Sequence, residues 1–123
     1  MKKFKIAYYV VTGLLSLMLL YSSIGMYLLQ TDMVKGFFEA LGFPTFIVIP
    51  LAIAKITGVV VLLTRFNDTI KEWAYAGFFF NFVLAAAAHI NVGDGEAGGA
   101  IMALVLLAVS YILDKKAFMA SLN

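Results

Sequence analysis

Four long stretches of the chain are almost free of charge, and this feature constrains the fold more than any other. They cover about residues 6–29, 45–64, 73–92 and 97–113. A helix of about 20 apolar residues is long enough to cross the hydrocarbon core of a bilayer. Charged residues make up 13% of the 123 residues, against about 25% in a typical soluble domain. We therefore predict an integral membrane protein whose first partner is the lipid bilayer, with no nucleic-acid-binding role.

The connections between these stretches are short, so consecutive helices are expected to lie antiparallel and adjacent. The predicted fold is all-α, an up-down-up-down four-helix bundle that forms a single domain over residues 1–123. A short amphipathic helix is predicted at Met33–Leu41 in the first outer connection, because apolar residues recur there at helical spacing. Asp32 can cap its start and Gly42 can end it. This helix would lie on the outer membrane surface or over the end of the bundle, and an irregular loop is the alternative.

Basic residues predict the orientation of the bundle. Seven of the nine Lys and Arg residues flank the spans at one end, namely Lys2, Lys3, Lys5, Arg65, Lys71, Lys115 and Lys116. Basic residues next to a span favour the cytoplasmic side. Both the N-terminus and the C-terminus are therefore predicted to be cytoplasmic.

Lys55 lies near the middle of the second span, in the segment FIVIPLAIAKITGVVVLLT. It is about ten residues from either end of the span, roughly 15 Å at 1.5 Å per residue. A lysine at the bilayer centre costs about 2.5–3.5 kcal/mol on insertion scales. We expect the side chain to face the bundle interior, where it lines a cavity. The alternative is a purely structural tether to carbonyl and hydroxyl groups.

Other polar residues in the spans are candidate neighbours of Lys55. Asn81 in the third span is expected at a similar depth, and its amide oxygen can accept a hydrogen bond from the ammonium without neutralising it. Four residues of the first helix recur on one helical face: Thr12, Ser16, Ser23 and Tyr27. Ser16 and Ser23 are therefore further pocket candidates, although small polar residues in membrane helices also serve as packing contacts.

His89 is the only histidine and lies near the outer end of the third span. It can take up and release protons near neutral pH, or it can reach lipid headgroups at the interface. Asp94 and Glu39 are its candidate partners. The chain has no cysteine and a single histidine, so it has neither thiolate metal ligands nor a pair of histidines to ligate a haem. We predict no catalytic or metal site, and we do not expect the chain to catalyse a reaction by itself.

Several short motifs spread along nearly the whole chain carry a family resemblance. They are LGFP at Leu41–Pro44, AKITG around Lys55, KEWAYAGFFF at Lys71–Phe80, HINVGDG at His89–Gly95 and VSYIL at Val109–Leu113. In these motifs the sequence resembles the DoxX-like family of small four-helix bacterial membrane proteins. The resemblance implies a bundle in the plasma (inner) membrane. It also implies a role in membrane redox work, with a quinone as the candidate cofactor and an oxidoreductase as the candidate partner.

Two departures from that family bear on the site. Relatives often carry an acidic residue where this chain has Asn81, and a proline in the turn near residues 65–67. An acid at position 81 would pair with the intramembrane lysine. Without one, Lys55 must be neutral, hydrated or bound to an anionic ligand.

These observations lead to three functional hypotheses. The first is a redox-accessory protein that binds a quinone or lipid-like molecule in a pocket with Lys55, Asn81 and His89. The second is a small transporter or ion conduit, which would need a homo-oligomer because four helices leave little lumen. The third is a structural or assembly protein with no small-molecule site.

Overall fold

The computed structural model describes residues 2–119, and four of its helical segments are long and apolar enough to cross a membrane. They are Lys2–Leu28, Thr45–Thr64, Asp68–Val92 and Gly98–Phe118. The second agrees with the predicted span, and the third begins at Asp68 rather than near residue 73. The prediction of an all-α, four-helix membrane bundle is confirmed.

The first span changes its helical form partway along. α1 (Lys2–Leu20) continues into η1 (Tyr21–Leu28), a π-helical segment. At the end of η1, the backbone N–H of Leu29 bonds the carbonyl of Ile24 at 3.2 Å, in the i to i−5 pattern of a π-helix. Such segments are rare and often occur at functional sites. Their wider turn alters which side chains share a face.

The predicted amphipathic helix is present as α2 (Thr31–Leu41). Gly42 ends it in the left-handed conformation, at a φ of 87°. The predicted cap by Asp32 is wrong, because Asp32 lies within the first helical turn and Gln30 occupies the capping position. Within residues 2–119, no side chain makes a capping hydrogen bond at the start of this helix.

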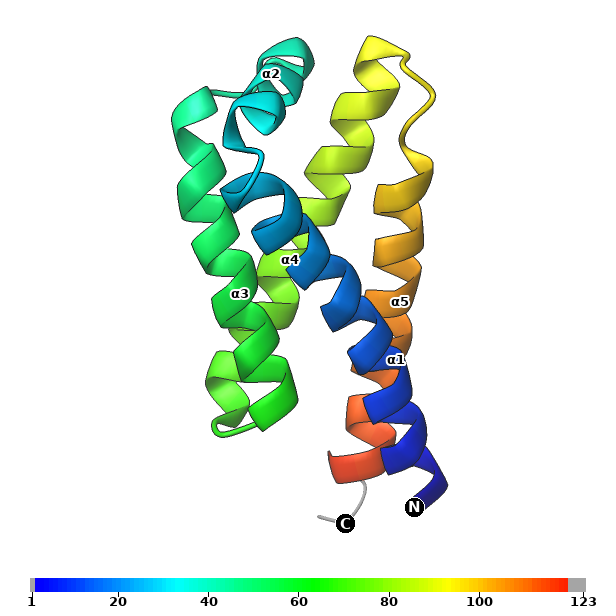
Figure 1. Ribbon diagram of the computed structural model, residues 1–123. Helices are drawn as coiled ribbons and strands as arrows, with labels where there is room; N and C mark the ends of the chain where they lie inside the picture. Colours follow the sequence, from blue (N-terminus) through cyan, green and yellow to red (C-terminus); the bar gives the residue numbers. More distant parts are fainter. Residues whose placement is uncertain (1, 120–123) are drawn as a thin grey trace.

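α2 lies over one end of the bundle (Figure 1). Its buried residues Val34 and Phe38 pack with Val48 in a small hydrophobic cluster. The ring of Phe38 also meets the ring of Tyr27 edge to face, with centroids 5.6 Å apart. Of the two predicted positions, α2 therefore takes the one over the end of the bundle.

The remaining helices complete a closed ring of four neighbours. With α1, the ring consists of α3 (Val48–Thr64), α4 (Asp68–Val92) and α5 (Gly98–Asp114). The 3₁₀ turn η2 (Thr45–Ile47) precedes α3, and α5 continues as the π-helical segment η3 (Lys115–Met119). α1 and α4 each pack against both α3 and α5. The N-terminus, the α3–α4 turn and η3 lie at one end, here called the terminal end (Figure 1). α2 and the α4–α5 turn lie at the other, the α2 end.

Gly58 allows α3 to pack closely against α4. A Cβ atom added to Gly58 would lie 2.5 Å from Cζ of Phe78. Phe78 is held on its other side by Phe82, whose ring stacks on it with centroids 5.9 Å apart. Both rings are buried in the main core, so a Cβ atom at position 58 can be accommodated only if Phe78 shifts against its stacked neighbour.

Gly58→Ala is expected to destabilise the protein by about 1–3 kcal/mol, because it overpacks this contact. Unfolding in mixed detergent and sodium dodecyl sulfate micelles measures the change. Gly13→Ala in α1 is the matched control, since a Cβ there meets nothing within 4 Å. Phe78→Leu should recover part of the loss in the Gly58→Ala background, and a control as destabilised as Gly58→Ala would contradict the account.

Candidate functional site

A cavity of about 1120 Å³ lies between the helices, in the half of the bundle on the α2 side. Residues of α1, η1, α2, α3, α4 and the start of α5 line it, and most of them are apolar. Its floor is made by four residues that also belong to the main core: Leu15, Leu19, Phe82 and Ala103. Lys55, Asn81 and His89 all line this cavity, whereas Ser16 and Ser23 do not.

Lys55 faces the interior of the bundle, and 7% of it is exposed. Its Nζ donates a hydrogen bond to Oγ of Ser22 at 3.3 Å. It also lies 4.0 Å from the centroid of the Tyr27 ring, within the range of a cation–π interaction. Among residues 2–119, no carboxylate lies within ion-pair distance of Lys55. The amine of Lys55 therefore has a hydroxyl and an aromatic ring as neighbours, and no acid of residues 2–119 pairs with it.

The sequence did not predict Ser22 as the partner of Lys55. On a regular α-helix, Thr12, Ser16, Ser23 and Tyr27 share a face, and Ser22 does not belong to it. The π-helical form of η1 shifts this register from Tyr21 onward. Nothing in the composition of YSSIGMYL distinguishes a π-helical segment from an α-helical one.

Asn81 lines the same cavity from α4 and is half-buried. Within the described part of the chain, its side chain makes no hydrogen bond to Lys55 or to any other residue. Its amide can therefore donate and accept hydrogen bonds with a molecule in the cavity.

His89 lies beside the turn between α4 and α5. Its Nδ1 is 2.8 Å from Oδ2 of Asp94, and Oδ1 of Asp94 accepts the backbone N–H of Glu96 at 2.9 Å. The predicted partnership with Asp94 is thus present, and Glu39 is exposed on α2. The hydrogen bond from His89, together with that from Glu96, lowers the pKa of Asp94 below its ordinary 3.8.

This pair gives a prediction for acid pH. The pKa of Asp94 is lowered in the folded state. Its ionised carboxylate therefore contributes to the stability of the folded protein above pH 3.8, and this contribution is lost as the pH falls through the lowered pKa. We expect a carbon-13 NMR titration of the Asp94 carboxyl group to have its midpoint below 3.8. In His89→Phe, which removes the hydrogen bond, the midpoint should rise. An unchanged midpoint in that variant would contradict the assignment.

The two predicted serines have other roles. Ser23 donates from Oγ to the carbonyl of Leu19 in its own helix. The buried Oγ of Ser16 has no hydrogen-bond partner among the described residues. On the same face of α1, Thr12 and Ser110 share a hydrogen bond of 2.6 Å that joins α1 to α5. Thr12 thus fits the alternative interpretation, in which small polar residues hold helices together, whereas neither predicted serine makes a hydrogen bond to another helix.

A buried ionic cluster at the terminal end was not predicted. Asp114 is fully buried, with Nη1 of Arg65 at 2.5 Å and Nζ of Lys71 at 2.9 Å from its Oδ1. Burial disfavours the charged guanidinium of Arg65, but the hydrogen bond to Asp114 and its charge outweigh that effect and raise the pKa of Arg65. The sequence contained a signal for this cluster, because an acid directly follows the fourth predicted span at the end where these bases lie.

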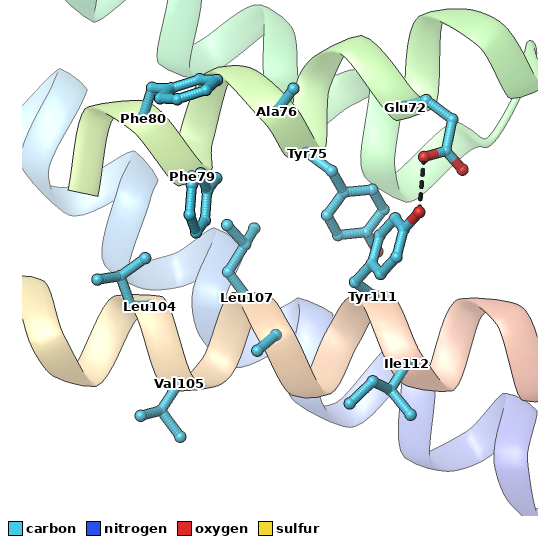
Figure 2. A pocket seen from close by; sticks show the side chains of 11 residues that line it. Glu72, Tyr75, Ala76, Phe79, Phe80, Leu104, Val105, Leu107, Tyr111 and Ile112 are labelled. Atoms are coloured by element: carbon cyan, nitrogen blue, oxygen red, sulfur yellow. Dashed lines mark hydrogen bonds between the residues drawn. The ribbon is translucent and has the colours of Figure 1, made fainter. Parts of the chain in front are cut away.

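A second hollow, of about 680 Å³, runs between α4 and α5 (Figure 2). Rings such as those of Phe79 and Tyr111 project into it from the two helices (Figure 2). Glu72 is the one charged residue among those that line it. Its carboxylate already accepts a hydrogen bond from Tyr111 at 3.0 Å and pairs with Lys115. The hollow thus offers apolar surface without a free charged group, which makes the larger cavity the better candidate site.

The four spanning helices and the apolar cavity between them define a small multi-pass helical membrane protein. A protein-family model described as the DoxX-like family matches residues 10–113. The chain therefore belongs to the DoxX-like family, as its motifs indicated. A search of curated proteins and a search of solved structures gave no match.

Proposed function

We propose that this protein is an accessory component of a membrane redox system and binds a quinone or lipid-like molecule inside the bundle. One observation carries the proposal, namely the large, mostly apolar cavity that Lys55, Asn81 and His89 all line. Small-molecule sites are mostly apolar, with a few polar groups that fix the orientation of the ligand. The cavity has this composition, and its volume of about 1120 Å³ is ample for a ring and the start of a tail.

The chemistry of the lining fits a head that carries carbonyl groups. The ammonium of Lys55 and the amide N–H of Asn81 can each donate a hydrogen bond to a carbonyl oxygen. The amide oxygen of Asn81 can accept one from the hydroxyl of the reduced form. A bound quinone would supply the electron-accepting group, and an oxidoreductase partner would supply the electrons.

The proposal also covers the membrane in which the protein resides and the partners with which it assembles. The protein resides in a bacterial plasma membrane with both termini in the cytoplasm, supported by the basic residues at the terminal end. α2 then lies on the outer side. The oxidoreductase docks on the exposed parts of the bundle, and a homo-oligomer is the alternative assembly.

A transporter or ion conduit is the second candidate. Lys55, which has no acidic partner among residues 2–119, would attract an anion. However, two carboxylates, Asp94 and Glu96, line the cavity near the α2 end, and they repel anions that approach from the water. The charge distribution therefore favours the first proposal.

A binding experiment tests the proposal. Purified protein in phosphatidylcholine nanodiscs should bind decylubiquinone in equilibrium measurements. Asn81→Leu should weaken binding about threefold to tenfold, since one hydrogen bond is worth about 0.5–1.5 kcal/mol. The control is Thr57→Val, because Thr57 is exposed on α3 and bonds the carbonyl of Ile53 in its own helix. Absence of saturable binding to the unmodified protein would refute the proposal.

A further inference from the structure

η1 and α5 stand apart on one side of the cavity. α1 packs against α5, but within residues 2–119 η1 packs against α3 and none of its Cα atoms lies within 8 Å of a Cα atom of α5. Figure 1 shows α1 crossing the bundle obliquely, from beside α5 at the terminal end toward α3 at the α2 end. In the α2 half, no helix therefore bridges η1 and α5.

Residues on both sides of this separation line the cavity. Met18 of α1 and two residues of η1, Ser22 and Met26, line the cavity from one side, and Gly99 lines it from α5. Met18 is 39% exposed, and methionine side chains are flexible enough to move aside. A Cβ atom added to Gly99 meets nothing within 4 Å. At Gly99, no side chain of α5 projects toward the cavity, and the methionine side chains on the other side can change conformation.

The floor and the depth of the cavity indicate where a ligand comes from. Packing of Leu15 and Leu19 in the main core closes the cavity toward the terminal end. Lys55 is ten residues from Thr45, about 15 Å along the helix. A molecule from the water at the α2 end would have to pass the carboxylates and this length of apolar wall. A molecule dissolved in the bilayer is already at that depth.

We propose that the cavity is filled sideways from the bilayer, through an entrance between η1 and α5, by a membrane-dissolved amphiphile. Its polar head reaches Lys55, and its apolar tail stays in the entrance, in the half of the membrane on the α2 side. The nature of the head rests on the proposed function, whereas the route rests on the geometry of the bundle alone.

The absence of cysteine from the chain allows a reversible test. Gly99→Cys places a thiol at the entrance. Gly77→Cys is the matched control, because Gly77 also lines the cavity and has open space at its Cβ position, but lies on α4. Each variant is modified with methyl or benzyl methanethiosulfonate and is later reduced. The readout is photolabelling of Phe82 on the cavity floor by hexadecan-1-ol that carries a diazirine at its third carbon, so that the reactive group lies beside the polar head.

We expect the benzyl group at position 99 to lower labelling of Phe82 at least fivefold and a reductant to restore it. The methyl group at position 99 and the benzyl group at position 77 should change labelling less than twofold. The route is refuted if Phe82 is not labelled in the unmodified protein, or if only the modification at position 77 blocks labelling.

Decylubiquinone binding to the same samples separates the two proposals. If labelling behaves as expected but decylubiquinone does not bind, the side entrance stands and the quinone role fails. If decylubiquinone binds while labelling is insensitive to position 99, the quinone role stands and the entrance fails.

Discussion

Replacing Asp114 with asparagine is expected to lower the free energy of unfolding by about 3–5 kcal/mol. Asp114 is fully buried and is the shared partner of Arg65 and Lys71, the latter only 1% exposed. Removing Asp114 leaves both cations without their buried partner in a poorly solvated site, and Lys71 keeps only a contact of 3.5 Å with the exposed carboxylate of Asp68. Because the cluster joins the α3–α4 turn to the end of α5, its loss should loosen the whole terminal end.

The Glu72–Lys115 pair provides the control. Both side chains are more than a third exposed, Glu72 at 40% and Lys115 at 35%. Exposed pairs contribute about 0–1 kcal/mol, so Glu72→Gln should have little effect. Unfolding by sodium dodecyl sulfate, followed by circular dichroism, compares the two variants. Equal stability of Asp114→Asn and Glu72→Gln would show that the buried cluster does not hold the bundle together.

Replacing Lys55 with methionine is expected to weaken decylubiquinone binding at least tenfold. The ammonium is the strongest hydrogen-bond donor on the cavity wall, and methionine keeps a similar shape without the charge. The stability of the protein should stay the same or rise, because replacing a buried charge by an apolar group often stabilises a protein. Binding isotherms and unfolding curves of the same samples in phosphatidylcholine nanodiscs measure both quantities.

This pair of measurements separates a ligand-binding lysine from a structural one. If Lys55 only tethers helices through Ser22 and Tyr27, its loss should leave any decylubiquinone binding unchanged. Thr57→Val, two residues further along α3, is the matched control and should change neither quantity. Tenfold weaker binding in that control as well would point to a general disturbance of α3.

The membrane-spanning helices could be predicted from the sequence because span length and absence of charge are imposed directly by the bilayer. The second span begins at Thr45 and ends at Thr64, as predicted. α2 could also be predicted from its apolar spacing and from Gly42, whose left-handed backbone conformation favours glycine. These features are local, so a sequence pattern is enough to reveal them.

The details of the site depend on long-range packing and could be predicted only in part. The inward direction of Lys55 follows from the cost of exposing a charge to lipid. Its contact with Ser22 depends on the π-helical form of η1, which no local pattern indicates. The role of Asp114 likewise depends on residues distant in the chain, because its partner Lys71 in α4 lies 43 residues earlier. In the sequence alone, Asp114 followed by Lys115 and Lys116 cannot be told from an ordinary charged helix end.

The central claim is that a ligand in the cavity binds through Lys55, and a solid-state NMR distance tests it most directly. The protein is labelled with nitrogen-15 at the lysine side chains, and decylubiquinone with carbon-13 at its ring carbonyls. Lys55→Met identifies the Lys55 signal by its absence. We predict dipolar coupling between the Lys55 nitrogen and a ring carbonyl, as expected for a hydrogen-bonded pair. Bound decylubiquinone with no such coupling would contradict the account.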